Sequence, residues 1–139
     1  MAKISLENRL AVYELIAKYS HEVDNYRGEA WADLFLDDGK LLGPANPFLG
    51  RQAFINQARS LKERGIQYRH VITSIYLDDD SNDEQATAHA YGVVSEWSEK
   101  PAKMDIFVNY RFDVVKRGEK WKFAVVNVDM PYSAEILQG

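Results

Sequence analysis

An aspartate and a histidine are the most promising pair for chemistry in this sequence. Asp24 ends a stretch with helical periodicity, and His70 stands far downstream in the triplet Tyr68-Arg69-His70. An imidazole takes and gives protons near neutral pH, and a neighbouring carboxylate fixes its tautomer and stabilises its protonated form. Brought together in one apolar interior, Asp24 and His70 could therefore remove a proton from carbon or oxygen.

Proton transfer of this kind also needs a hydrogen-bond donor for the oxygen that gains charge or leaves. The candidates for the wall of such a pocket are mostly aromatic, and they are Tyr19, Trp31, Phe35, Tyr68, His89, Tyr91 and Tyr110. The four tyrosines among them are the candidate donors. Proton removal beside a carbonyl followed by loss of a neighbouring hydroxyl is a dehydration, and return of the proton elsewhere is an isomerisation.

The segment that carries Asp24 has the periodicity of an amphipathic helix, which we expect over about residues 6 to 25. Ser5 is placed to cap its first turn. The apolar or small residues of its stripe are Leu6, Leu10, Tyr13, Ala17 and Ser20, and Val12, Ile16, Tyr19 and Val23 widen it. The 3.6-residue period puts Asp24 on this same face, so its carboxylate should point toward the interior, where it needs a partner.

Two further helices and a short strand are expected before the pattern changes at residue 66. A helix carrying Trp31, Leu34 and Phe35 should stop at Asp37-Asp38-Gly39. A brief strand over residues 40–43 and a turn rich in glycine and proline follow. A third helix starts at about Arg51, and Gly65 suits the left-handed position just past its end.

Four long strands make up the second half of the chain. From residue 66 onward the period is two, with β-branched and aromatic residues enriched over residues 68–77, 86–97, 104–115 and 121–130. The short polar loops between them predict an antiparallel meander. Helices followed by a meander give an α+β domain, in which the helices cover the concave face of a curved, mainly antiparallel sheet and enclose a conical cavity with one open end.

Composition narrows the classes of protein. The chain has 139 residues, 46% of them apolar, and a net charge of −4. This size fits a single domain over residues 1–139, with a C-terminal tail from about residue 131. Because acidic and basic residues are interleaved, we expect no nucleic-acid partner. The absence of a long apolar run and of a signal peptide predicts no membrane association and a cytoplasmic protein.

The sequence offers little to hold a metal or a cofactor. Cysteine is absent, and the three histidines show no metal-ligand spacing. Glycine-rich nucleotide-binding motifs and the glycine-x-serine-x-glycine elbow of serine hydrolases are also missing. We therefore expect no metal and no cofactor, which leaves acid/base chemistry by side chains as the enzyme class.

The order of the expected helices and strands, together with several short motifs, resembles the NTF2-like superfamily, and specifically its SnoaL-like and scytalone-dehydratase-like branch. The segments that carry the resemblance are Tyr19-Ser20-His21-Glu22-Val23-Asp24, residues 31–39, Gly50-Arg51, Tyr68-Arg69-His70-Val71 and Trp121-Lys122-Phe123. The resemblance spans about residues 6 to 130. It implies the cone fold, and it places a catalytic Asp at Asp24 and a catalytic His at His70.

Two departures from the family pattern limit what carries over. Many relatives have a Tyr-x-Asp pair on the third long strand, where this chain reads Asn109-Tyr110-Arg111-Phe112-Asp113. The second histidine of the dehydratases has no clean counterpart, with His89 or Tyr91 nearby. The resemblance thus implies a pocket and an Asp-His pair, without a particular substrate.

The resulting hypothesis is a cofactor-independent general acid/base enzyme, a dehydratase, isomerase or cyclase acting on a small apolar, carbonyl-containing or polycyclic substrate. The alternative is a non-catalytic ligand-binding or accessory domain, including a subunit like the small subunits of ring-hydroxylating dioxygenases. Asp24 could instead pair with Arg27 or Arg69, and His70 could be an ordinary core histidine. Val126 and Val128 suggest an apolar outer sheet face, so we expect a homodimer. The tail from Pro131 is expected to cover the cavity mouth.

Overall fold

Helices and strands are mixed along the first half of the chain, and the described part of the second half consists of strands and the loops between them. A computed structural model describes residues 2–44 and 47–130, so the expected role of the C-terminal tail lies outside the described residues. The elements are α1 (Leu6–Asp24), α2 (Gly28–Ala32), β1 (Phe35–Leu42), β2 (Phe48–Leu49), α3 (Arg51–Glu63), β3 (Tyr68–Leu77), β4 (Gln85–Glu96), β5 (Lys103–Arg117) and β6 (Lys120–Asp129).

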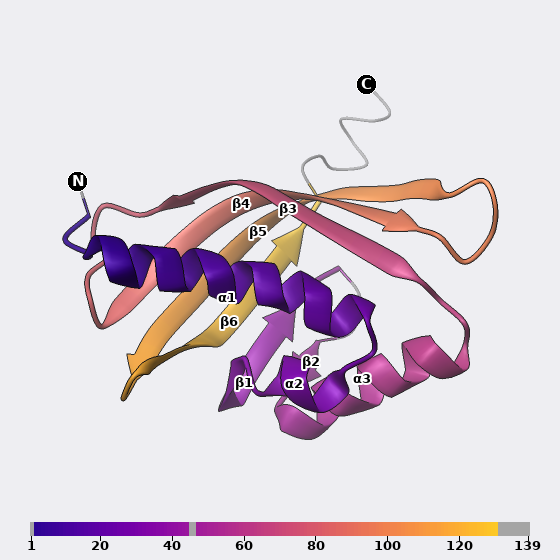
Figure 1. The fold of residues 1–139 in the computed structure, drawn as a ribbon, viewed down its shortest axis with the longest axis horizontal. Coiled ribbons are helices and arrows are strands. Elements are labelled where there is room, and N and C mark those ends of the chain that lie inside the picture. Colours follow the sequence, from indigo (N-terminus) through magenta and orange to yellow (C-terminus); the bar gives the residue numbers. More distant parts are fainter. Residues whose placement is uncertain (1, 45–46, 131–139) are drawn as a thin grey trace.

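The strands form one six-stranded sheet in the order β2-β1-β6-β5-β4-β3. Strands β3 to β6 make an antiparallel meander, while β1 runs parallel to β6 and antiparallel to β2. Figure 1 shows the long strands curving behind α1, with α2 and α3 near the β1–β2 end. The predicted class, helices on one face of a curved and mainly antiparallel sheet, is confirmed.

Helix α1 begins at a serine cap, as predicted. The Ser5 hydroxyl accepts a hydrogen bond from the Asn8 backbone nitrogen at 3.1 Å. The predicted stripe is buried only in part, because Leu6 and Leu10 are 81% and 67% exposed. The buried residues are Val12, Leu15, Ile16, Tyr19, Ser20, Val23 and Asp24, and all of them except Leu15 belong to the predicted apolar side. Asp24 is therefore buried as predicted, and the burial is shifted toward the residues that widen the stripe.

The first turn of α1 is fastened to three other segments through Asn8. Its side-chain amide donates a hydrogen bond to Oδ1 of Asp83, a residue of the β3–β4 loop, at 3.0 Å. Its carbonyl oxygen accepts from Trp121 Nε1 at 3.1 Å and from Lys116 Nζ at 3.2 Å. These bonds fix one end of the helix to the far end of the meander.

The second helix is shorter than predicted, which corrects the assignment of Phe35. Helix α2 ends at Ala32, and Phe35 opens β1 by pairing with Phe123 of β6. Pairing with β6 gives the backbone groups of Phe35 hydrogen-bond partners in the sheet. This tertiary pairing overrides the helical spacing of the apolar residues. The third helix agrees with prediction, and Gly65 has a φ of 67° just beyond its end.

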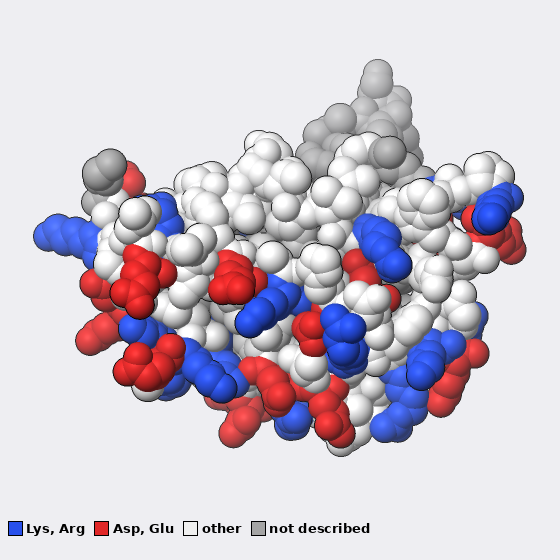
Figure 2. Space-filling model, viewed as in Figure 1, with Lys and Arg blue, Asp and Glu red and all other residues white. Residues whose placement is uncertain are grey.

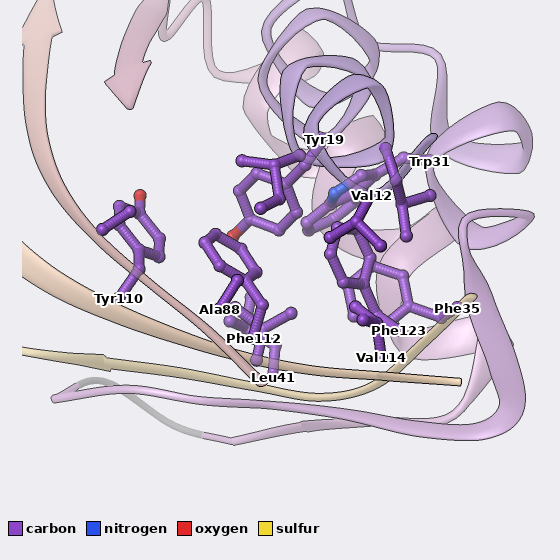
Figure 3. Close-up of a cluster of buried hydrophobic side chains, with 14 of the residues drawn as sticks. Val12, Tyr19, Trp31, Phe35, Leu41, Ala88, Tyr110, Phe112, Val114 and Phe123 are labelled. Carbon is purple, nitrogen blue, oxygen red and sulfur yellow. The ribbon is translucent and has the colours of Figure 1, made fainter. Parts of the chain in front are cut away.

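Aromatic rings fill the space between the helices and strands β5 and β6. Tyr19 of α1 lies at the centre, with ring centroids about 6 Å from those of Trp31, Phe35, Phe112 and Phe123. Figure 3 shows these rings facing one another between α1 and the sheet. Edge-to-face packing of this kind adds to the burial of apolar area, so this part of the interior is a solid core.

Charged side chains are distributed without a continuous stripe of either sign on the face seen in Figure 2, where basic and acidic groups alternate. None of the described helices is long and apolar enough to cross a membrane.

Candidate active site

The structure brings Asp24 and His70 into direct contact. Asp24 Oδ1 lies 2.6 Å from His70 Nδ1, and Asp24 Oδ2 accepts a hydrogen bond from the His70 backbone nitrogen at 2.8 Å. The two side chains are 5% and 16% exposed. Both carboxylate oxygens of Asp24 are thus engaged by the same residue of β3.

Local structure at the end of α1 explains why the carboxylate turns inward. Tyr26 adopts a positive φ of 61° directly after the helix, and its hydroxyl donates to the Ile66 carbonyl at 2.8 Å, just ahead of β3. Arg27, which could have paired with Asp24, pairs with Glu22 at 2.9 Å. The end of α1 is therefore held against the start of β3, and Asp24 meets His70.

The contact defines the protonation pattern of the imidazole. A carboxylate only accepts hydrogen bonds, so Nδ1 of His70 is the donor to Asp24. The lone pair of a neutral His70 then lies on Nε2, which is the atom that can take a proton. Asp24 holds the ring in this tautomer, and its carboxylate is placed to stabilise an imidazolium if Nε2 takes a proton.

A cavity of about 170 Å³ reaches His70 between α1 and β3. Its lining residues are Tyr13, Ile16, Ala17, Ser20, His21, His70, Ile72 and Ile75. At roughly 30 Å³ per water molecule, this space holds a small organic group. The wall is mixed, and its polar side-chain groups are the hydroxyls of Tyr13 and Ser20 and the imidazoles of His21 and His70.

Three of the predicted tyrosines lie close to the pair. The rings of Tyr19 and Tyr68 pack edge-on against His70, with centroids 6.2 and 6.0 Å away. Tyr110 packs against Tyr19 at 6.1 Å. Burial, helped by the nearby charge of Asp24, raises the pKa of Tyr110, and burial followed by the charges of Tyr110 and Asp24 raises that of Tyr19. Both phenols therefore stay protonated and remain donors over the physiological range.

Two predicted pocket residues, His89 and Tyr91, lie on the opposite face of the sheet. The small side chains of Ala88 and Ala90 point into the core, so the residues that alternate with them on β4 point outward. His89 Nε2 lies 2.8 Å from Asp78 Oδ1, and Tyr91 is 64% exposed. Neither side chain reaches Asp24, which corrects their placement in the same pocket.

Trp31 and Phe35 were also predicted to line the pocket, and they belong to the aromatic core. They are 2% and 3% exposed, and both rings pack against Phe54. Their role in the structure is therefore packing beneath the site rather than contact with a ligand.

Ser20 and Ile72 line the cavity although neither was predicted to be a pocket residue. Ser20 lies one helical turn before Asp24, and Ile72 lies two positions after His70 on the same side of β3. Both periodicities were available as signals. Among the described residues, no group of three His, Asp or Glu side chains could hold a metal ion.

Comparison with known proteins agrees with the fold. A family model described as a SnoaL-like domain matches residues 5–127, and the chain belongs to this family. No protein among those with curated functions matches the sequence. The solved structures that resemble the chain have the cystatin-like NTF2 fold.

Three solved structures illustrate this likeness. An NTF2-like protein from Novosphingobium aromaticivorans is 21% identical, with a TM-score of 0.79 over 96% of this chain and 88% of its own. A protein from Catenulispora acidiphila in complex with S-DNPA is 22% identical, with a TM-score of 0.80 over 97% and 100%. A candidate scytalone dehydratase from N. aromaticivorans is 21% identical, with a TM-score of 0.75 over 89% and 87%. At these identities the likeness concerns the fold.

Proposed function

We propose that the chain is a cofactor-independent acid/base enzyme, a dehydratase, isomerase or cyclase, that acts on a small apolar carbonyl compound. The observation that carries the proposal is the buried contact between Asp24 and His70, with Nδ1 bonded at 2.6 Å and Nε2 left as the base. A structure of the same fold holds a small ligand, and another is a candidate dehydratase. Both support a pocket that binds and converts small molecules.

In this mechanism His70 Nε2 takes the proton from the carbon next to the substrate carbonyl, whose oxygen gains the negative charge of the enolate. Asp24 stabilises the imidazolium through the bond to Nδ1. The imidazolium then returns the proton. Delivery to a departing hydroxyl completes a dehydration, and delivery to another carbon completes an isomerisation. In a cyclisation the enolate carbon attacks a second carbonyl of the same molecule, and the imidazolium gives its proton to the alkoxide oxygen that this attack forms.

Removal of the carbon-bound proton is common to all three reactions, so it can be tested without the natural substrate. The purified protein is incubated in deuterated water with a panel of ketones such as 1-tetralone, 2-tetralone and a decalone, and deuterium uptake is followed by NMR. We expect exchange above the buffer rate for at least one ketone. His70→Gln and Asp24→Asn should lower that rate, by about 10²- to 10⁴-fold for the loss of the base.

His89→Gln is the matched control, because it changes the same residue type on the outer face of the sheet, beside Asp78. Its exchange rate should equal that of the unchanged protein. Exchange no faster than in buffer for every ketone, or equal rates in the His70→Gln and His89→Gln variants, would contradict an enzyme of this kind.

Non-catalytic binding in the same cavity is the competing function. It needs no contact between Asp24 and His70, whereas the structure has two hydrogen bonds between them. Binding of a ketone that neither variant alters, together with no exchange, would favour this alternative.

The proposal includes a homodimer formed across the outer face of the sheet. Val126 faces the core at 0% exposure, so the apolar patch is not where the sequence suggested. Val71 and Phe107 are instead about half exposed, and both pair with Val93 in adjacent strands. Covering such a row stabilises an assembly. Analytical ultracentrifugation should give a dimer mass that Phe107→Glu halves; a monomer mass for the unchanged protein at micromolar concentration would refute it.

A further inference from the structure

A glycine in the middle of β4 makes room for the Tyr110 ring. A Cβ atom added to Gly92 would lie 2.4 Å from Cε2 and 3.1 Å from Cδ2 of Tyr110. Gly92 pairs with Ile72 of β3 on one side and with Val108 of β5 on the other. The Tyr110 ring therefore leans across the backbone of β4 toward β3, the strand that carries His70. Glycine inside a strand marks such a close approach.

The other face of the Tyr110 ring is held as firmly. It stacks on Phe112 with ring centroids 5.2 Å apart and an interplanar angle of 8°, and Tyr19 meets it edge-on. With Gly92 on one side and two rings on the others, Tyr110 has little freedom to turn. Its hydroxyl is consequently held in one place rather than sweeping through several rotamers.

Tyr110 is a buried residue whose hydroxyl has no hydrogen-bond partner among the described residues. The residue is 4% exposed, and its hydroxyl makes no hydrogen bond with the part of the chain that the structure describes. Within that part, Trp31 Nε1 is the one fully buried polar side-chain atom without a partner, so the Tyr110 hydroxyl keeps some accessible surface. Figure 3 shows it directed away from the sheet, toward the helix layer.

This hydroxyl also lies near the acid/base pair. Asp24 is close enough for its charge to help raise the pKa of Tyr110, which keeps the phenol protonated. Tyr19 touches both the His70 ring and the Tyr110 ring. A donor without a partner in the protein gains a hydrogen bond when an oxygen atom reaches it, and a ligand oxygen supplies such a partner.

We propose that Tyr110 is a catalytic hydrogen-bond donor to the substrate's carbonyl oxygen, and that Gly92 is the positioning residue that lets its ring reach the Asp24–His70 pair. This inference rests on the proposed acid/base function and specifies its oxygen site. As His70 removes the proton from carbon, the carbonyl oxygen becomes an enolate oxygen, and the Tyr110 hydroxyl donates to it without losing its own proton. The substrate class is a compound whose ionised form is a planar enolate or phenolate.

The probe is 4-nitrophenol, whose neutral and anionic forms differ in absorbance. Its anion carries the charge of an enolate on an oxygen next to a planar ring. Dissociation constants for both forms are measured by titration at pH values on either side of its ionisation. Tyr110→Phe should weaken binding of the anion about ten- to hundred-fold, the value of one hydrogen bond to a charged group, and leave binding of the neutral form within about threefold.

Gly92→Ala tests the positioning role with the hydroxyl retained. Its methyl group displaces the ring, so the anion should again bind more weakly than the neutral form. Gly43→Ala is the matched control, because its new Cβ meets nothing closer than 3.8 Å. Tyr91→Phe removes a phenol hydroxyl from the exposed face of the same strand and should change neither constant. The unfolding midpoint of each variant confirms that it folds, and Tyr110→Phe decides the question if Gly92→Ala does not fold.

Each contrary result has a separate meaning. Unchanged anion binding in Tyr110→Phe with weakened binding in His70→Gln overturns the donor assignment and leaves the Asp24–His70 pair standing. Unchanged binding in both variants overturns the donor and the proposed function together. Equal weakening of the neutral and anionic forms shows that Tyr110 is a packing residue, and an unchanged protein that binds neither form also overturns the assignment.

Discussion

Asp24 and His70 should be strongly coupled in the free energy of unfolding. Asp24→Asn keeps the shape of the side chain and removes its charge, while His70→Gln removes the ring and keeps the backbone bond to Asp24. A double-mutant cycle over these changes isolates the contact between the side chains, which are 2.6 Å apart and almost buried. A buried hydrogen bond to a charged group is worth about 1.5–3 kcal/mol, and we expect a coupling of this size.

The same chain supplies a control pair of the same residue types. His89 and Asp78 lie 2.8 Å apart on the outer face, with side chains 31% and 38% exposed. Because water screens exposed ion pairs, the cycle over His89→Gln and Asp78→Asn should give a coupling of about 0–1 kcal/mol. The two Asp–His pairs thus differ in the burial of their side chains and have nearly the same distance between the interacting atoms.

Urea unfolding of the unchanged protein and the six variants at neutral pH, with linear extrapolation to water, gives the free energies. Equal m-values across each cycle are needed for the comparison, since a changed slope signals a changed denatured state. A coupling below about 0.5 kcal/mol for Asp24 and His70, or equal couplings in the two cycles, would refute the inference that burial makes this contact strong.

Three further perturbations have definite outcomes. Ser5→Ala removes the acceptor for the Asn8 nitrogen and should destabilise the protein by about 1 kcal/mol in urea unfolding, whereas no loss would show that the cap is redundant. Phe112→Ala deletes a ring with 0% exposure and should cost about 3–5 kcal/mol, and a cost below about 1 kcal/mol would mean that the core collapses around the gap. Burial raises the pKa values of Tyr19 and Tyr110, so the native state keeps their protons when the unfolded chain loses them. Stability should therefore be complete below the ordinary tyrosine pKa of about 10 and fall as pH rises beyond it. Tyr110→Phe should make that alkaline decline shallower in urea unfolding, and an unchanged slope would contradict the pKa shift.

The long strands were predictable because their period is unambiguous. The prediction for β3, residues 68–77, coincides with the strand in the structure, since alternation and β-branched residues agree there. Phe35 was misplaced because the spacing of Trp31, Leu34 and Phe35 suits a helix, and a single sequence gives no sign that Phe35 will pair with Phe123. The helical preference of the local sequence is overridden by strand pairing with a residue almost ninety positions away.

At the site, too, the periodicity of the sequence predicted some side-chain positions and left others undetermined. The helical period placed Asp24 inside, and this was sufficient for the main prediction. The misplacement of His89 and Tyr91 came from choosing the wrong face of β4. His70 pairs with Val94, so the even-numbered positions of β4 point inward with His70, but that register depends on how the strands align. The resemblance to dehydratases with a second histidine suggested a pocket role for His89 and Tyr91, whereas the neighbouring Ala88 and Ala90 face the core and leave space for the rings of β5.

The length of helix α1 sets the distance and the rotation between two anchored residues. Asn8 is tied to three segments at one end, and Asp24 meets His70 at the other. These positions are sixteen residues apart, or roughly 24 Å along the axis, and each residue turns the helix by about 100°. An added or deleted residue between them would rotate the Asp24 carboxylate away from His70 or break the hydrogen bonds of Asn8. Helix α1 can therefore accept substitutions of its side chains, while insertions and deletions are confined to the loops.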